Sequence, residues 1–547
     1  EPVVHLWIVV APPEGALPTG LHTLDTYVAV NSLRHGVPGY FSPYACCHTP
    51  GAPAGLGFYA LVYHHVYGLL GLLNPGIPVF IYLGMLNGLG VAVLLLAAWR
   101  FFRVAAPHLA GKAFLLFALG GGLGGVLYAV AAATGWAAAA DFARDFSRFF
   151  FYDLNEGARF QPYLLAARLY YTLPYACGLL GLAALLRALE GGSRRRLAVV
   201  AGGLFLCTLV NFRIGPMLWA AGLMMCASAD APALRRRVRA AAVLTLGMLA
   251  GLAGALALLS RNPVLAAGSI RTLNAVILPV SFVSATLPLW PVLPGALWRS
   301  LAGAPRWLRA VGAGVAAFLL VYLLLYAAHQ AYYGNWLHGG EASASVLASD
   351  WALLALAPGL AAGWLWRRRA PGGLPAWAAL WLLGFLALGA GSFGQGWYRQ
   401  LLPERCLVVL GPPLALLAAD GLHRLAARRP WMARSLLAVA VGCGVVSAFV
   451  TWAVAYGPLG YRTLQTRYPW TRNAFMDTAD ATLLARFPDL HPLADGLLET
   501  LVAGLEEPHP LELLGQVALG HVVAFVGVGV VVVAAVAQLA HQGRRRV

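Results

Sequence analysis

Long stretches of this chain carry almost no charge, and this feature restricts the fold more than any other. Runs such as 77–99, 239–260 and 435–456 are long enough, as helices, to cross the roughly 30 Å hydrocarbon core of a bilayer. The chain is 60% hydrophobic and 11% charged, whereas soluble domains are about 25% charged. A soluble protein of this composition could not cover its surface with polar groups. The sequence therefore predicts an all-α, polytopic transmembrane helical bundle.

The apolar runs indicate about 13 spans. The run 196–228 is long enough for two of them, but Asn211, Arg213, Gly215 and Pro216 interrupt it. A charge near the bilayer centre costs about 2.5–3.5 kcal/mol on insertion scales, so we expect a helical hairpin whose polar tip meets water or protein. The other expected spans are 77–99, 113–134, 162–188, 239–260, 272–291, 311–333, 346–366, 374–394, 405–424, 435–456 and 516–540.

The apolar stretch at the start of the sequence, 3–13, is too short to cross a bilayer. Because residue 1 is Glu, this stretch is either the tail of a longer first span or the remnant of a processed signal, and we expect the tail of a span. The predicted organisation is a transmembrane domain, 1–456, with a long first external loop, 13–76. A small extracytoplasmic cap, 457–515, and a final helix with a basic cytoplasmic tail, 516–547, follow it.

Basic residues outnumber acidic residues by 38 to 21, which gives a net charge of +17. They occur in short clusters between apolar runs and not in a basic stripe with aromatic residues, so we expect no nucleic-acid partner. Such clusters mark the cytoplasmic ends of spans. All of them fall on one side if 196–228 crosses outward and returns and 272–291 crosses, and the C-terminus is then cytoplasmic. The clusters are 100–112, 191–196, 234–239, 299–309, 366–369, 423–430 and 544–546.

The segment 55–73 is apolar and aromatic, but His64 and His65 interrupt it. The span 77–99 must itself run inward, so a crossing by 55–73 would invert the N-terminal tail. We expect 55–73 to be an interfacial or re-entrant helix packed on the bundle. A true span is the alternative.

Asp25 is the first acid of the long external loop. It lies at an expected helix start, with Thr23 as a candidate cap and Gly36 as a stop. An acid in a first helical turn also complements the helix dipole without any catalytic role. Its position just outside the first span nevertheless favours a site at the membrane surface.

A second group of acids lies in 139–163, where Asp153 and Glu156 occupy an expected turn at the mouth of the next span. That placement makes them candidate catalytic residues. The alternative is an interfacial amphipathic helix with charge pairs spaced four residues apart and an aromatic belt.

Three arginines are candidate phosphate ligands, because the guanidinium fork matches phosphate oxygens. Arg399 and Arg405 lie on the expected external side at a span entrance, and Arg213 lies at the hairpin tip. The alternatives are interfacial anchoring for the first two and a side chain that extends to the headgroups for Arg213.

Cys46, Cys47 and His48 stand together in the first external loop. A zinc site there would need further ligands folded back from elsewhere, so His48 and Asp25 are only weak metal candidates. The Gly-rich stretch 120–125 lies inside an apolar run. It indicates close helix packing and not phosphate binding.

The segments "LDTYVAVNSLRHGVPGYFSPY" and "FYALVYHHVYGLLG" resemble an uncharacterised bacterial branch of the GT-C superfamily. So does the layout of a short first span, a long external loop with an early acid, surface helices and many later spans. This superfamily contains polytopic glycosyltransferases such as protein O-mannosyltransferases and lipid A aminoarabinose transferases. The resemblance covers about residues 1–230. The chain has Asp-Thr where many members have an acidic pair, and it carries no diagnostic C-terminal motif.

The resemblance implies transfer of a sugar from a polyprenyl-phosphate donor to an acceptor on the external face of a bacterial inner membrane. Asp25 would act as the base, or as a ligand of a divalent metal, which is the one cofactor implied. Membrane lipids and other membrane proteins are the further partners expected. Two alternatives stay open: a transporter or flippase, and a non-catalytic subunit of a larger membrane complex.

Overall fold

The computed structural model describes residues 33, 63–74, 76, 77, 79–133, 169–191, 193–228, 234–259, 285–333, 351–366, 373–390 and 403–456. These residues form helices joined by turns, with no strand among them, which confirms the all-α class for this part of the chain. The helices are α3 (Tyr63–Leu72), α4 (Val79–Ala105), α5 (Ala110–Leu119), α6 (Gly124–Ala133), α9 (Leu169–Glu190), α10 (Arg194–Val210), α11 (Ile214–Ser228), α12 (Leu234–Leu259), η4 (Leu287–Leu289), α15 (Leu293–Ala302), α16 (Arg306–Tyr333), η5 (Leu353–Ala355), α18 (Leu356–Leu365), α19 (Ala376–Ala390), η6 (Pro403–Leu410), α21 (Gly411–Arg428) and α22 (Pro430–Tyr456).

Five of these helices are long and apolar enough to cross a membrane: α4, α9, α12, α16 and α22. Each overlaps an expected span. Shorter apolar helices include α5, α11 and α19. The helices indicate an integral membrane protein, whereas the expected number of about 13 spans stays a prediction. The cap 457–515 and the final span 516–540 lie outside the described residues.

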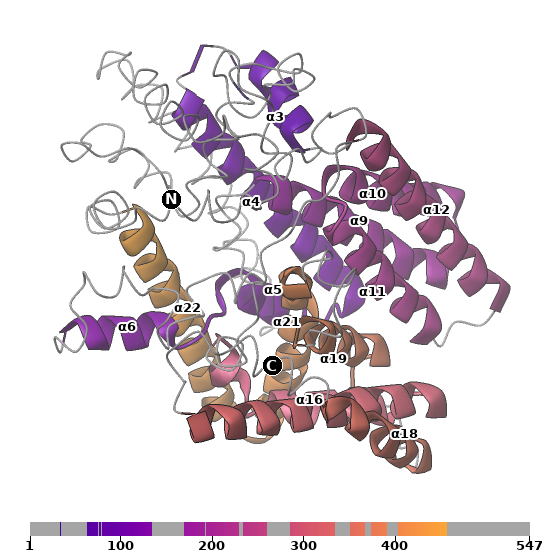
Figure 1. The fold of residues 1–547 in the computed structure, drawn as a ribbon, viewed down its shortest axis with the longest axis vertical. Helices are drawn as coiled ribbons and strands as arrows, with labels where there is room; N and C mark the ends of the chain where they lie inside the picture. Colours follow the sequence, from indigo (N-terminus) through magenta and orange to yellow (C-terminus); the bar gives the residue numbers. More distant parts are fainter. Residues whose placement is uncertain are drawn as a thin grey trace, which may run out of the picture.

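Helices α4, α9, α10 and α12 lie side by side (Figure 1). The amide of Leu169 donates to Asn87 Oδ1, and Gly90 faces Thr172, so α4 and α9 run parallel. Gly247 of α12 contacts the backbone of α10. Gly251, four residues later, contacts α10 four residues further along, so these two helices are also parallel. Glycine at the contacts lets the helix backbones approach closely, which is typical of membrane helix packing.

The expected hairpin in 196–228 is confirmed as two helices, α10 and α11, that break at 211–213. Gly178 of α9 faces Leu218, and four residues later Leu182 faces Gly222, so α11 runs parallel to α9. The short link from α9 to α10 reverses the chain, and α10 therefore runs opposite to α11. The chain leaves one end of the bundle along α10 and returns to it along α11.

The expected span 113–134 is not one continuous helix, because the chain unwinds between α5 and α6. Gly120 is extended, with φ −66° and ψ 132°, and ends α5. The Gly121 amide donates to Ala440 O of α22 at 3.1 Å. Ser447 of α22 accepts from the Gly125 amide and donates to Gly122 O, both at 3.1 Å. The glycines do pack closely, as expected, but they pack in an interrupted helix whose backbone bonds are completed by α22.

A second group of helices contains α15, α16, α18 and α19, and Figure 1 shows α16 and α18 running together. Gly363 packs on Ala310, and Gly359 packs on Gly314, so α16 and α18 are antiparallel. The Ser300 hydroxyl donates to the carbonyl of Pro375, just before α19, at 2.9 Å. This bond fixes the start of α19 beside the end of α15.

The basic clusters of the described helices share one end of the bundle, which we call the basic end. Arg236 at the start of α12 donates to Glu190 O at the end of α9, at 2.7 Å. Met224, near the end of α11, packs against a core cluster that contains residues from the end of α15, the start of α16 and α19. The rings of His108, after α4, and His423, in α21, are 5.7 Å apart. These contacts bring together the clusters that were expected on one side of the membrane.

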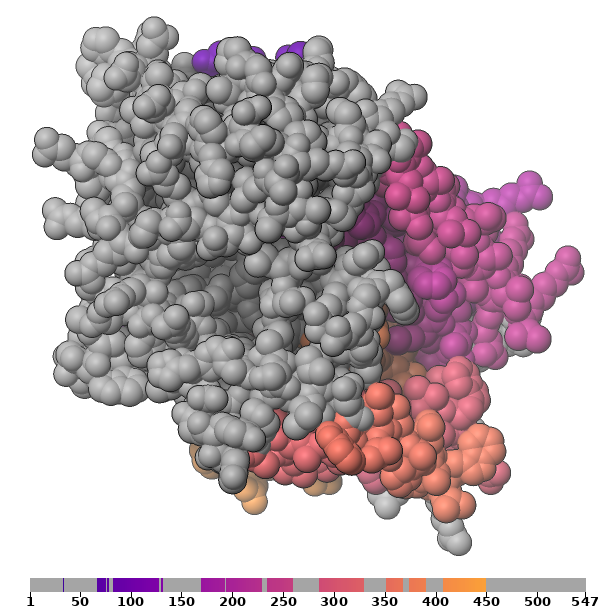
Figure 2. Space-filling view, viewed as in Figure 1, coloured from indigo at the N-terminus to yellow at the C-terminus, as the bar shows by residue number. Residues whose placement is uncertain are grey.

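The outer side of the group formed by α9, α10, α11 and α12 is apolar. Leu246, Leu249 and Leu256 of α12 are exposed. The magenta surface of α10–α12 forms one flank of the molecule in the space-filling view (Figure 2). In contrast, most of α9 is buried. An exposed apolar flank around a buried central helix is the arrangement expected when lipid is the surrounding solvent.

The described part of 55–73 is α3, a ten-residue helix. Ten residues extend about 15 Å, which is too short to cross a bilayer. Tyr82 Oη donates to Leu70 O at 2.8 Å and Tyr67 is buried, whereas Leu73 is 72% exposed. α3 therefore packs on the start of α4, and its interfacial position stays a prediction.

Cysteine labelling tests this topology. In a chain whose native cysteines are replaced, we expect Leu73→Cys to react from the outer side and Arg429→Cys, at the basic end, from the inner side. Gly51→Cys, outside the described residues, should be labelled from the same side as Leu73→Cys, because we expect 55–73 not to cross the membrane. Labelling of positions 51 and 73 from opposite sides would show that 55–73 is a span.

Candidate functional site

The turn between α10 and α11 is organised by Asn211. Its side-chain oxygen accepts from the amides of Arg213 and Ile214 at 3.2 and 3.3 Å, which caps α11. Its side-chain nitrogen donates to Tyr170 O at 3.1 Å. Pro174, four residues after Tyr170 in α9, has no N–H for that carbonyl, so Asn211 satisfies a backbone group that the proline leaves open.

Arg213 projects from this turn. Its guanidinium carbon lies 5.4 Å from the centre of the Phe212 ring. Nε is buried without a hydrogen-bond partner, and the described residues supply no carboxylate for an ion pair. The side chain is half-buried, so it is partly accessible. An arginine fixed at its backbone and lacking a local counter-ion is suited to an anionic ligand.

Arg213 lies at the end of the bundle opposite the basic end, because α10 starts at the basic end and finishes at this turn. Arg405 belongs to η6, which packs on α11 and α19 and precedes α21. α21 runs toward the basic end, so the backbone of Arg405 lies toward the opposite end, as Arg213 does. These are the two arginines that the described helices place away from the basic end, and both are predicted phosphate ligands.

The start of α9 lies beside the turn that carries Arg213, because the Tyr170 carbonyl accepts a hydrogen bond from Asn211. Segment 139–163, with Asp153 and Glu156, precedes this start in the sequence. Asp153 and Glu156 themselves lie outside the described residues, as do Asp25, His48 and Arg399. Their catalytic, metal-binding and phosphate-binding roles stay predictions. Among the residues that the structure places, no group of three His, Cys, Asp or Glu side chains could hold a metal ion.

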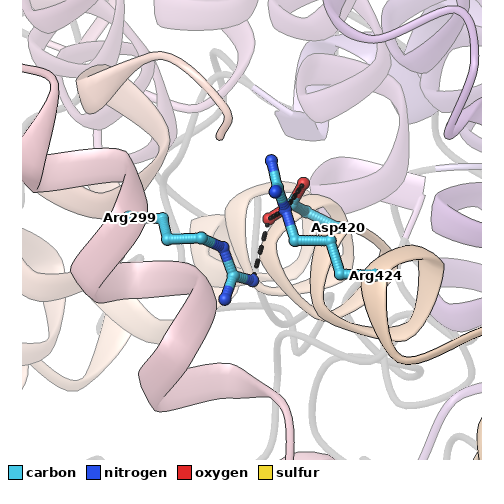
Figure 3. Close-up of polar contacts among 3 residues, drawn as sticks. All are labelled: Arg299, Asp420 and Arg424. Atoms are coloured by element: carbon cyan, nitrogen blue, oxygen red, sulfur yellow. Dashed lines mark hydrogen bonds and ion pairs between the residues drawn. The ribbon is translucent and has the colours of Figure 1, made fainter. Parts of the chain in front are cut away.

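Sequence reasoning missed a second polar site, at the basic end. Asp420 of α21 is 4% exposed. Its Oδ2 accepts from Arg299 Nη2 of α15 at 3.2 Å, and both its oxygens accept from Arg424 Nε at 3.3 Å (Figure 3). The available signal was an acid four residues before an arginine inside an apolar run. The sequence predicts only a span, 405–424, and a basic cluster, 423–430, in that run.

The fold and these two polar sites define a helical integral membrane protein with opposite, chemically different ends. Comparison with family models, characterised proteins and solved structures found no match to this chain.

Proposed function

We propose that the chain is a GT-C-like glycosyltransferase that moves a sugar from a polyprenyl-phosphate donor to an acceptor on the extracytoplasmic face of the bacterial inner membrane. The observation that supports this most is the Arg213 turn. It holds an arginine that has no carboxylate partner among the described residues, at the end of the bundle opposite the basic clusters. A lipid-linked phosphate would reach such a group from the membrane while its sugar faces water.

In the proposed reaction, a carboxylate takes the proton of the acceptor hydroxyl. The acceptor oxygen forms a bond to the sugar's anomeric carbon as the bond from that carbon to the phosphate oxygen breaks. Polyprenyl phosphate leaves with the bonding electrons. Asp25 is the proposed base, with Asp153 and Glu156 as supporting acids, and Arg213, Arg399 and Arg405 would bind the phosphate. A divalent metal held by Asp25 is the one cofactor proposed.

Reconstitution tests the activity. Purified protein in liposomes would receive a panel of labelled polyprenyl-phosphate hexoses and aminopentoses, with a cell-envelope fraction as the acceptor. We expect label to move from lipid to acceptor with at least one donor. Failure with every donor, from folded protein, would contradict the proposal.

Arg213→Gln tests the phosphate contact. A hydrogen bond to a charged group is worth about 1.5–3 kcal/mol, so the KM for the donor should rise about 10- to 100-fold. Arg196→Gln is the matched control, because Arg196 is an exposed arginine at the basic end that donates to Arg187 O and Gly191 O. The control should keep its KM. Equal KM values for the two variants would show that Arg213 does not bind the donor phosphate.

A transporter or flippase is the second candidate function, and the break between α5 and α6 favours it. Discontinuous membrane helices commonly surround transported substrates. The unwound segment 120–123 is held by Ser447 of α22. Lipid translocation by protein-containing liposomes, in the absence of any transfer of label, would support this function over the transferase.

A further inference from the structure

The Arg299–Asp420–Arg424 cluster carries more positive charge than its one carboxylate neutralises. Two guanidinium groups from α15 and α21 share Asp420, which leaves a net charge of +1 (Figure 3). The Arg299 and Arg424 side chains are 32% and 43% exposed, whereas the Asp420 side chain is 5% exposed. The carboxylate therefore lies buried beneath the two guanidinium groups, and an external ligand would contact the two arginines.

Most donors of these two arginines have no acceptor among the described residues. A guanidinium has five N–H groups, and Arg299 bonds to Asp420 through Nη2 and Arg424 through Nε. Among the residues that the structure places, neither side chain has another acceptor, and Arg299 Nε is buried without a partner. Donors of this kind favour an anion with several oxygens, which can accept from both guanidinium groups at once.

The surroundings of this cluster are those expected at the level of membrane headgroups. Trp298, one residue before Arg299, is 51% exposed, and its ring lies 3.7 Å from that of Trp366. Trp307 and Trp431, at the starts of α16 and α22, are 49% and 69% exposed. Tryptophan concentrates where a membrane protein passes from hydrocarbon to water. A ligand at this depth is expected to have an apolar tail as well as an anionic head.

We propose that the Arg299–Asp420–Arg424 cluster binds the phosphate headgroup of an anionic membrane lipid. Asp420 fixes the two guanidinium groups between α15 and α21, and the remaining charge of +1 matches a phosphodiester of charge −1. The Trp298–Trp366 pair lies beside the glycerol and upper acyl region. Basic sites between membrane helices commonly recognise acidic lipids in this way. This site lies at the basic end, so it does not depend on the transferase function proposed for the opposite end.

Lipid addition to the delipidated full-length protein in neutral detergent tests the source of the phosphate. Phosphatidylglycerol should raise the unfolding temperature in a saturable manner, because a ligand that binds only the folded state stabilises it. Phosphatidylcholine, with no net charge, and inorganic phosphate, with no acyl chains, should give no shift at equal concentration. An equal shift with inorganic phosphate, or with phosphatidylcholine, would overturn the lipid assignment.

Native mass spectrometry of two variants tests whether the lipid binds at this cluster. The parent protein should retain one phosphatidylglycerol at a lipid concentration where Arg424→Gln retains none. Arg429→Gln is the matched control: it removes the same charge from an exposed side chain just beyond α21, whose one side-chain hydrogen bond within the described structure is to Met432 Sδ. It should keep the lipid. Equal loss from both variants would mean that general positive charge attracts lipid, and the proposed site would be wrong.

Arg424→Lys separates geometry from charge without removing a cation. Lysine keeps the charge but lacks the planar fork, so retention of phosphatidylglycerol should fall between that of the parent protein and Arg424→Gln. Full retention by Arg424→Gln, with the protein folded by circular dichroism, would also overturn the proposal.

Discussion

Asp25→Asn should abolish most transfer activity while leaving the protein folded. If Asp25 is the base or the metal carboxylate of the proposed transferase, turnover should fall by about 10²–10⁴, the usual contribution of a positioned acid–base group. An acid that merely complements a helix start contributes about 0.3–1 kcal/mol to stability. The unfolding temperature should therefore change little. The measurement is transfer of labelled sugar from whichever polyprenyl-phosphate donor proves active.

Glu190→Gln provides the matched control for this substitution. Glu190 is an exposed acid at the end of α9, at the basic end, and its backbone carbonyl accepts from Arg236. The change removes one negative charge at the end of the bundle opposite Arg213, so turnover should stay that of the parent. If turnover by Asp25→Asn stays within about threefold of the parent, Asp25 has no catalytic role.

The sequence identified the features that are encoded locally. The break in 196–228 was predictable because Asn211 and Arg213 interrupt an apolar run, and a bilayer does not accept unpaired polar groups. The common end of the basic clusters was predictable from charge placement and crossing order. The bond from Asn211 to Tyr170 O was not predictable. It depends on Pro174 of α9 and Asn211 being brought together from positions distant in the chain.

Features that depend on distant partners were missed. The glycines at 120–125 sit in an apolar run, and close packing and unwinding are equally consistent with such a stretch. Ser447, which decides between them, lies 322 residues after Gly125. Asp420 is similar: its bond to Arg299 spans 121 residues, and only the packing of α15 on α21 creates it. Composition and periodicity report which residues prefer burial, but they do not specify which helices meet.

Where α22 crosses the break between α5 and α6, the two backbones approach so closely at Gly444 that no side chain fits. A Cβ added there would overlap Leu119 O, and it would lie 2.7 Å from Gly121 N and 2.9 Å from Gly120 C. All three are backbone atoms, so no side-chain rotation can relieve the overlap. Moving the break away from α22 would weaken the Ser447 bonds that complete its backbone. The site therefore has little freedom to adjust to a larger residue.

Gly444→Ala should consequently destabilise the protein, although alanine is the better helix former. Overpacking of a well-packed interior costs about 1–3 kcal/mol, and backbone overlap places this site toward the upper part of that range. Gly442→Ala is the control on the same helix, because a Cβ there has no atom within 4 Å. It should be neutral or stabilising by up to about 1 kcal/mol, the helix-propensity difference between the two residues. Thermal unfolding in detergent measures both variants. A Gly444→Ala protein as stable as Gly442→Ala would show that α22 does not approach the interrupted helix this closely.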